Sequence, residues 1–386
     1  MFKRWLSLKH DKSILIIGPR RCGKTTYLKQ NYPDWNYATL DDLDFLGWAK
    51  KDPKGFIQQF GERFIIDEIQ RYPELTIAVK YAIDNKNAEV LMTGSSALGL
   101  LDSTADTLAG RIRIYSFPTA CWGENDGMPD HSIFSDKLDY SKIKEASRLL
   151  KEAVTYGQFP EVITQSNEDQ KNEILKNYKN TYFIRDLMQL SNIENLEALL
   201  TIFNHLALSI GSHLEVSNFA QKSGLSHVTT KKYLNTLYQS QLTFKLYGYQ
   251  YGPVKRYMKS VKTYFSDNGV IKSLNVQLNE GQLIENFVIS ELEKRRKLGY
   301  IQCDQFFYYK SAAGREIDLI FEHLGELYLV EIKTTLKPSS RDIKNLKELK
   351  KQMNRPLKLY LFYLGEEYQN IEGVNIIPVS ALYKGK

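Results

Sequence analysis

Hydrophobic residues in the first third of the chain fall into short continuous runs separated by longer segments with a helical pattern. The strongest runs are SILII (13–17), RFII (63–66) and AEVLM (88–92). Short apolar runs that alternate with helical segments are typical of buried strands in a parallel sheet. The pattern through residue 115 therefore predicts an α/β domain with a parallel sheet.

The pattern changes after residue 120. Residues 121–136 are polar and rich in turn formers, which indicates a loop or insertion. Residues 141–210 read as mostly helical, with a last apolar helix that stops at Gly211. Residues 216–241 then predict two helices joined by the turn GLS, followed by a strand from Leu242. This order is that of a helix-turn-helix with a wing.

The last third combines one amphipathic helix with several strands. GQLIENFVISELEKRR (281–296) places Ile284, Phe287, Val288 and Leu292 on one side. FFYYKSAAGREIDLI (306–320) reads as strand, turn and strand, and EIDLIFEHLGELYLVEIKTT (316–335) as a hairpin. We predict three domains, at 1–135, 136–265 and 266–386.

Composition is ordinary for a globular protein of two or three domains. The chain has 386 residues and a net charge of +7, which mildly favours a polyanionic partner and fits a slightly basic protein equally well. Cys22, Cys121 and Cys303 are far apart, which predicts reduced thiols in a cytoplasmic protein. The absence of any long apolar segment predicts no membrane partner and excludes a transporter.

The strand at 13–17 leads into GPRRCGKTT, which matches G-x-x-x-x-G-K-[ST] and precedes a helix-forming run. In this context backbone amides wrap a phosphate, the lysine reaches the β- and γ-phosphates and the hydroxyl coordinates Mg²⁺. The sequence therefore predicts ATP and Mg²⁺ as cofactors. The predicted nucleotide-binding residues are Gly18, Pro19, Arg20, Arg21, Cys22, Gly23, Lys24, Thr25, Thr26 and Asp67.

Further candidates for ATP chemistry follow the next strands. Asp67 ends one strand and is predicted to hold Mg²⁺ with Thr25, while Glu68 is predicted to orient or deprotonate the attacking water. Ser95 and Ser96 fit a γ-phosphate sensor or, equally well, a helix N-cap. Arg111 fits an arginine finger or state sensor, and alternatively a surface residue near a turn.

These motifs resemble the AAA-type ATPases of bacteria and archaea whose C-terminal half is a domain of unknown function. The resemblance rests on GPRRCGKTT, IIDEIQR, TGSSALGLL and LAGRIRIYSFPT, and continues through YGQFPEV, YFIRDL and YFSDNGV. It implies an AAA-like ATP-binding core, a winged-helix middle and a nuclease-like end. AAA-type sites often borrow an arginine from a neighbouring subunit, so a homo-oligomer and the role of Arg111 in cis, in trans or neither stay open.

The segment from Lys222 to Lys262 contains eight Lys or Arg, no Asp or Glu, and interleaved tyrosines. Such composition is typical of a nucleic-acid-binding face. Lys231 and Lys232 are predicted on the recognition helix, and phosphate contacts are predicted for Lys255, Arg256 and Lys259. We expect DNA as the partner; the alternative is a winged helix that only connects domains.

Charged residues interrupt the predicted C-terminal hairpin at Asp318, Glu331 and Lys333. Glu331 and Lys333 share one face of a strand, and Glu285 borders the apolar side of the preceding helix. This layout resembles the PD-(D/E)xK phosphodiesterase superfamily, which implies a restriction-endonuclease-like α/β domain. Asp318 and Glu331 are predicted metal ligands, and Glu285, Asp318, Glu331 and Lys333 catalytic residues.

Two alternatives for this hairpin stay open: charges at the exposed end of an edge strand, or an inactive nuclease fold that still binds nucleic acid.

Taken together, the motifs predict an ATPase whose nucleotide state controls a DNA-binding winged helix and a nuclease-like domain. The alternatives are a signalling or defence switch, and a nucleotide-dependent binding module without nuclease activity.

Overall fold

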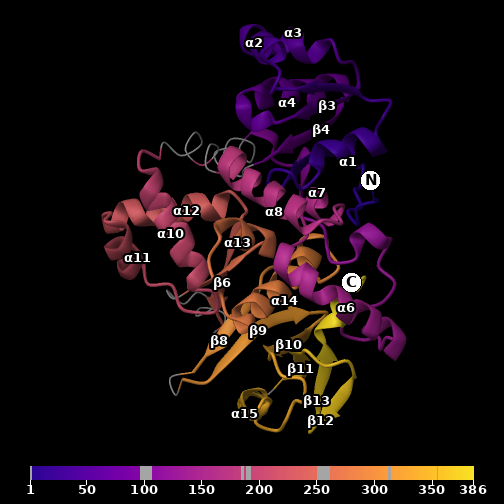
Figure 1. Cartoon of the computed structure of the whole chain (residues 1–386). Coiled ribbons are helices and arrows are strands. Elements are labelled where there is room, and N and C mark those ends of the chain that lie inside the picture. The colour runs from indigo at the N-terminus through magenta and orange to yellow at the C-terminus, as the bar shows by residue number, and fades with distance from the viewer. Residues whose placement is uncertain are drawn as a thin grey trace.

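The computed structural model describes residues 2–95, 107–183, 187, 193–249, 261–311, 314–353 and 355–386. Two sheets lie at opposite ends of the molecule, and most helices of the middle segment lie between and beside them (Figure 1). The N-terminal sheet is drawn in indigo and purple, and the C-terminal sheet in orange and yellow. Among the described residues no helix is long and apolar enough to cross a membrane.

The N-terminal sheet has five strands in the order β2-β3-β4-β1-β5, and every neighbouring pair is parallel. This confirms the parallel α/β prediction. Both faces of β1 are buried because its side chains alternate between two apolar clusters, one with Leu15 and Ile17 and the other with Ile14 and Ile16. The strands are β1 (Ser13–Ile17), β2 (Asn36–Thr39), β3 (Arg63–Asp67), β4 (Glu89–Gly94) and β5 (Ile112–Ser116).

Helices connect these strands, and their ends follow local capping chemistry. The Asp42 carboxylate accepts the amides of Asp44 and Phe45, and Asp52 caps the helix that starts at Pro53. Among the described residues these helices are α1 (Lys24–Asn31), α2 (Leu43–Lys51), α3 (Pro53–Gln58) and α4 (Leu75–Lys86).

The middle segment is helical, as predicted. Ser226 caps the second helix of the predicted helix-turn-helix, and Gly224 ends the first with φ 66°. The helices are α6 (Tyr140–Tyr156), α7 (Pro160–Ile163), α8 (Glu168–Asn177), a π-helix (Tyr178–Phe183), α10 (Leu196–Leu208), α11 (Val216–Ser223) and α12 (His227–Gln239).

The second sheet has eight strands in the order β12-β13-β11-β10-β9-β8-β6-β7. The hairpin of β6 and β7 extends this sheet, because β6 pairs in parallel with β8. The predicted boundary at 265/266 therefore falls inside one continuous sheet. The strands are β6 (Thr243–Gly248), β7 (Val261–Phe265), β8 (Phe307–Lys310), β9 (Glu316–His323), β10 (Glu326–Ile332), β11 (Leu357–Tyr363), β12 (Gln369–Ile371) and β13 (Val374–Pro378).

Three helices accompany this sheet: α13 (Asn268–Leu274), α14 (Glu280–Lys297) and α15 (Lys344–Gln352). A capping box between Asn279 and Gln282 starts α14. One apolar core runs from Trp122 to Leu382 and includes residues of the middle segment and of the sheet. The middle and C-terminal segments are therefore packed as one body.

Asp267 lies where three parts of the chain meet. Its buried carboxylate accepts the Thr119 hydroxyl at 2.7 Å, the Gln158 amide at 3.0 Å and the Lys294 ammonium at 2.9 Å. Thr119 follows β5, Gln158 lies between α6 and α7, and Lys294 lies on α14. A single side chain therefore ties the N-terminal domain to both other segments.

This junction leaves no space at Gly157. A Cβ atom there would lie 1.8 Å from Asp267 Oδ1, and the residue has φ 70°. Gly61 has a similar φ of 74° but no atom within 4 Å of an added Cβ. Comparing alanine substitutions at the two glycines therefore distinguishes the effect of backbone strain from that of the close approach to Asp267.

We expect Gly61→Ala to cost about 1 kcal/mol from the left-handed backbone alone, and Gly157→Ala to cost more than about 3 kcal/mol. The extra loss arises because the new methyl displaces a buried hydrogen-bonded carboxylate. Denaturant unfolding of both variants measures the difference. Equal losses of stability would contradict the tight junction.

Candidate functional sites

The predicted phosphate loop forms between the end of β1 and the start of α1. Gly23 has φ 95° and Arg21 has φ 57°, so the loop turns through left-handed backbone conformations. At Gly18 a Cβ atom would lie 2.0 Å from the carbonyl oxygen of Phe117. The loop therefore needs glycine at both ends, once for conformation and once for space.

Lys24 points back into this loop. Its buried ammonium donates to the carbonyl oxygens of Gly18 at 2.8 Å and Pro19 at 3.1 Å. The side chain is therefore held at the concave side of the loop, where the backbone amides and the start of α1 favour an anion.

Asp67 at the end of β3 collects three hydroxyl groups. Its carboxylate accepts Thr25 Oγ1 at 2.8 Å, Tyr37 Oη at 2.7 Å and Thr93 Oγ1. Thr25 and Asp67 thus meet as predicted, and their oxygens are the hard ligands that fit Mg²⁺. Tyr37 and Thr93 were missed, although parallel pairing with β2 and β4 places both beside the end of β3.

Glu68 has φ 58° and its carboxylate accepts a hydrogen bond from Gln70 Nε2. The same amide donates to Ser95 Oγ at 2.8 Å. The predicted base and one predicted sensor residue are therefore joined through Gln70, which sequence analysis did not single out. The other sensor candidate, Ser96, lies outside the described residues.

Arg111 is not brought to the phosphate loop of its own chain. Ser13 pairs with Ile112, so Arg111 lies at the amino end of β5, whereas the loop follows the carboxyl end of β1. Its guanidinium forms a bidentate ion pair with Asp84, at 2.6 and 2.9 Å. This pairing lowers the pKa of Asp84. This position argues against an action of Arg111 within its own site, and leaves an action in trans or no role in ATP chemistry as the alternatives.

The middle segment reaches the phosphate loop. Glu161 on α7 forms an ion pair with Arg21, and Pro160 lies 3.8 Å from the Cβ position of Gly23. From the other side, Arg4 donates to the Cys22 carbonyl at 2.5 Å and to buried Glu124 at 2.9 Å. The loop is therefore enclosed by residues from outside its own motif.

The C-terminal charges predicted from the hairpin also come together. Asp318 lies on β9 and Glu331 on the adjacent β10, which pair antiparallel. Lys333 Nζ donates to Glu331 Oε1 at 2.7 Å, and Asp318 Oδ2 accepts the Ile332 amide at 2.8 Å. Glu331 is 3% exposed, which excludes the alternative of charges at the solvent-exposed end of an edge strand.

Glu285 faces this cluster from α14, and β7 contributes two residues that sequence analysis missed. Tyr264 Oη donates to Glu285 Oε1 at 2.7 Å, and buried Lys262 forms an ion pair with Glu316. Tyr264 begins the stretch YFSDNGV that contributed to the family resemblance, and Lys262 lies two residues before it. Neither was connected to the cluster because β7 was assigned to the middle domain.

Burial raises the pKa of Glu285 to about 7, and repulsion from Asp318 adds to the shift. Burial likewise raises the pKa of Glu331 to about 8, while Lys333 opposes the shift. Burial alone would lower the pKa of Lys262, but attraction to Asp318 and Glu285 outweighs it and raises the pKa. Burial therefore favours the protonated form of both carboxyl groups, and the two ammonium groups only partly oppose this effect.

A divalent cation fits part of this chemistry. Glu331 Oε2 is buried and has no hydrogen-bond partner within the described chain, so this oxygen is available to a cation. However, no group of three or more His, Cys, Asp or Glu in the described ranges is arranged to hold a metal ion. Asp318 and Glu331 therefore offer at most a two-carboxylate site completed by water, as Mg²⁺ commonly accepts.

The basic segment is divided by the structure. Lys231 and Lys232 are exposed on α12, as predicted for a nucleic-acid-binding helix. Lys245 instead lies 4.1 Å from the Tyr238 ring, and Lys262 is 2% exposed and ion-paired. Lys262 is therefore turned inward and does not contribute to a basic surface, whereas Lys245 is half-buried. Lys255, Arg256 and Lys259 lie outside the described residues.

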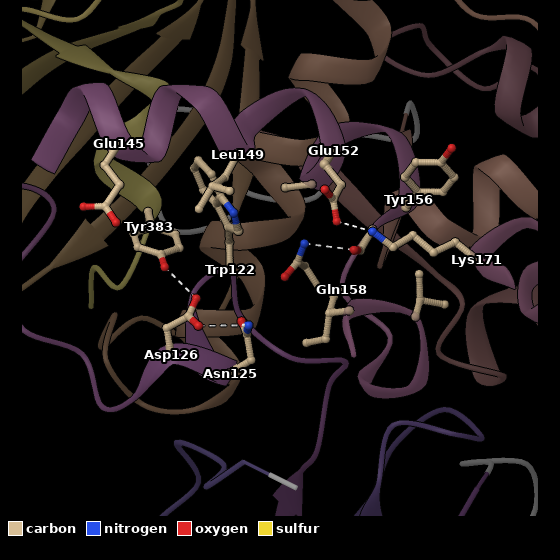
Figure 2. A pocket seen from close by; sticks show the side chains of 14 residues that line it. Trp122, Asn125, Asp126, Glu145, Leu149, Glu152, Tyr156, Gln158, Lys171 and Tyr383 are labelled. Carbon is tan, nitrogen blue, oxygen red and sulfur yellow. Dashed lines mark hydrogen bonds and ion pairs between the residues drawn. The ribbon is translucent and has the colours of Figure 1, made fainter. Parts of the chain in front are cut away.

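A cavity of about 360 Å³ lies away from both sites, between α6, the loop after residue 120 and the C-terminal end of the chain (Figure 2). Lys171 and Glu152 form an ion pair in its wall, and the Tyr383 hydroxyl donates to Asp126 at 2.5 Å. The first contact joins α8 to α6, and the second joins the C-terminal end of the chain to the loop after residue 120.

Three family models match successive segments of the chain. A model described as an AAA domain matches residues 10–125, and two described as domains of unknown function, DUF8612 and DUF4143, match residues 147–281 and 280–382. The N-terminal segment is thus an AAA-like P-loop domain, of the ATPase class, and it is followed by a C-terminal DUF4143 segment.

Two relatives match most of this chain and most of their own length. An uncharacterized protein of Methanocaldococcus jannaschii is 26% identical over 88% of this chain and 79% of its own length. An uncharacterized protein of Haemophilus influenzae is 25% identical over 95% and 92%. Among solved structures, the Walker-type ATPase PABY2304 of Pyrococcus abyssi is 16% identical, with a TM-score of 0.43 over 69% of this chain and 92% of that chain.

The raised carboxyl pKa values predict a pH dependence of stability. Because Glu285 and Glu331 hold protons in the folded state that the unfolded chain releases above about pH 4.3, their contribution is full below that pH and is lost as the pH rises toward about 8. With a chelator present, Glu331→Gln should reduce the loss of unfolding free energy between about pH 5 and 8.

Chemical unfolding at several pH values measures this slope, and Glu62→Gln, at an exposed position before β3, is the matched control. The same slope in Glu331→Gln and in the wild type would show that the buried cluster does not hold these protons.

Proposed function

We propose that this protein is an ATP-driven switch that binds DNA through its middle segment and cleaves phosphodiester bonds at the C-terminal cluster. The observation that carries the proposal is the cluster of Glu285, Asp318, Glu331 and Lys333, of which Glu331 is buried and the other three are half-buried; an ATPase-type domain in the same chain supports it. Burying like charges without a catalytic or binding role costs several kcal/mol.

The nucleotide site follows from the phosphate loop. Lys24 would contact the β- and γ-phosphates, and Thr25 and Asp67 would hold Mg²⁺, which neutralises charge on the phosphates. Arg20, Arg21, Cys22 and Thr26 would line the loop. Glu68 would orient the attacking water, and the hydrogen bond from Gln70 would hold its carboxylate in place.

Control by nucleotide requires a connection between the two sites, and the contacts supply a candidate. Arg21 of the loop pairs with Glu161 on α7, and α7 follows directly on Gln158, whose amide binds Asp267. Asp267 binds Lys294 on α14, the helix that also carries Glu285. A shift of the loop on ATP binding would therefore be transmitted to the helix beside the acidic cluster.

At the C-terminal cluster, Asp318 and Glu331 would hold a divalent cation, whose chemistry is to polarise a phosphoryl oxygen and to acidify a bound water. Lys333 would stabilise developing negative charge, and its hydrogen bond to Glu331 fixes its position. Exposed Lys231 and Lys232 on α12 support a winged helix that contacts backbone phosphates.

A second function is favoured by a specific observation. The described residues supply no three-ligand metal cluster, so the C-terminal fold fits a nucleotide-dependent binding module that does not cleave DNA. A defence or signalling switch would differ from both, because its ATPase would hold the C-terminal domain inactive until a trigger acts. An arginine finger supplied in trans by Arg111 would require a homo-oligomer.

The experiment incubates the full-length protein with labelled single- and double-stranded DNA, with Mg²⁺ or Mn²⁺, and with or without ATP. We expect Lys333→Ala to lower cleavage by about 10²-fold, because the transition state loses a positioned cation. Lys24→Ala should abolish ATP binding and any response of cleavage to ATP.

Lys337→Ala is the matched control, since this exposed lysine lies four residues after Lys333 in the same loop region. Intact ATP hydrolysis without cleavage of either DNA by the wild type would reject the nuclease and leave the binding module. Absence of DNA binding at low salt, with and without ATP, would reject DNA as the partner.

A further inference from the structure

We infer that the C-terminal acidic cluster is a composite site, in which Tyr264 of the β6–β7 hairpin is a positioning residue that holds the Glu285 carboxylate beside Asp318. This inference rests on the proposed metal-dependent site and adds a residue from outside the predicted C-terminal domain. The cluster lies within the segment 280–382, whereas Tyr264 belongs to the segment 147–281.

A hydrogen bond joins Tyr264 to Glu285. Tyr264 is fully buried, and its hydroxyl donates to Glu285 Oε1 at 2.7 Å. Burial and the nearby Glu285 raise the pKa of Tyr264, so the hydroxyl keeps its proton and remains a donor. A half-buried carboxylate with one fixed donor has a restricted orientation, which is what a metal or water ligand needs.

The position of β7 along α14 is fixed by the neighbouring residues. The next residue of each element forms a two-way contact: the Phe265 amide donates to Asn286 Oδ1 at 2.8 Å, and Asn286 Nδ2 donates to the Phe265 carbonyl at 3.1 Å. Asn286 is fully buried. This pair fixes the helix against the strand, so that Tyr264, one residue before Phe265, meets Glu285, one residue before Asn286.

Other residues of the middle segment also lie close to the Glu285 carboxylate. An added Cβ at Gly211, after α10, would lie 2.9 Å from both Glu285 oxygens. Lys262 lies two residues before Tyr264 and pairs with Glu316, two residues before Asp318 on β9. Since alternate residues of a strand share a face, Lys262 and Tyr264 point to the same side as these carboxylates.

The test is a double-mutant cycle on the full-length protein, with Mn²⁺ titrated in the absence of nucleotide and binding followed by calorimetry. Asp318→Ala identifies the binding component that belongs to the C-terminal cluster. We expect Tyr264→Phe and Glu285→Gln each to raise the Mn²⁺ dissociation constant of that component about tenfold. The double variant should bind no more weakly than the single variants, because Tyr264 acts only through Glu285.

Thr263→Val is the matched control: it removes a buried hydroxyl that lies 2.7 Å from Tyr238 Oη, on the opposite face of the same strand. It should leave Mn²⁺ affinity unchanged, which separates positioning from a general loss of stability. Wild-type affinity in Tyr264→Phe, or additive losses in the double variant, would overturn the inference while leaving the proposed metal site. Absence of Mn²⁺ binding by the wild type would overturn the proposed site and this inference together.

Discussion

The buried carboxylate of Asp267 is the interaction on which the arrangement of this protein depends. It accepts hydrogen bonds from the region after β5, from the turn between α6 and α7, and from Lys294 of α14. Lys294 in turn binds Glu291, which also accepts the Trp122 amide at 2.9 Å and pairs with Arg295. Burial favours protonated Glu291, but the two cations outweigh it and lower its pKa. Each charged group here has a partner of opposite charge. The junction therefore holds the three segments together without leaving an unpaired buried charge.

The C-terminal cluster shows the opposite electrostatic situation. Burial and mutual repulsion raise the pKa of Glu285, Asp318 and Glu331, and one Glu331 oxygen has no partner in the described part of the chain. Both clusters contact α14, one near each end of the helix, since Glu285 and Lys294 are nine residues apart on it. At the Lys294 end of α14 the charged groups all have partners, and at the Glu285 end they do not. This pattern is expected when a rigid part of the fold supports a functional site.

Local patterns predicted much of this structure. The phosphate loop, the parallel sheet, the paired helices α11 and α12 and the C-terminal hairpin all follow from periodicity, glycine positions and capping residues. Contacts between distant segments could not be predicted in this way. The pairing of β6 with β8, the ion pair of Arg21 with Glu161 and the bond from Tyr264 to Glu285 depend on tertiary packing, for which a single sequence carries no signal. The same limit explains why Arg111 was considered for a site that its strand register places out of reach.

We propose that nucleotide at the phosphate loop acts on α14 through Asp267. Hydrogen exchange of the α14 amides, measured with and without a non-hydrolysable ATP analogue, tests it most directly. We predict slower exchange with the analogue in the wild type, and no such change in Asp267→Asn, although that variant still binds the analogue. The same nucleotide effect in Asp267→Asn, or no effect in the wild type, would contradict the claim.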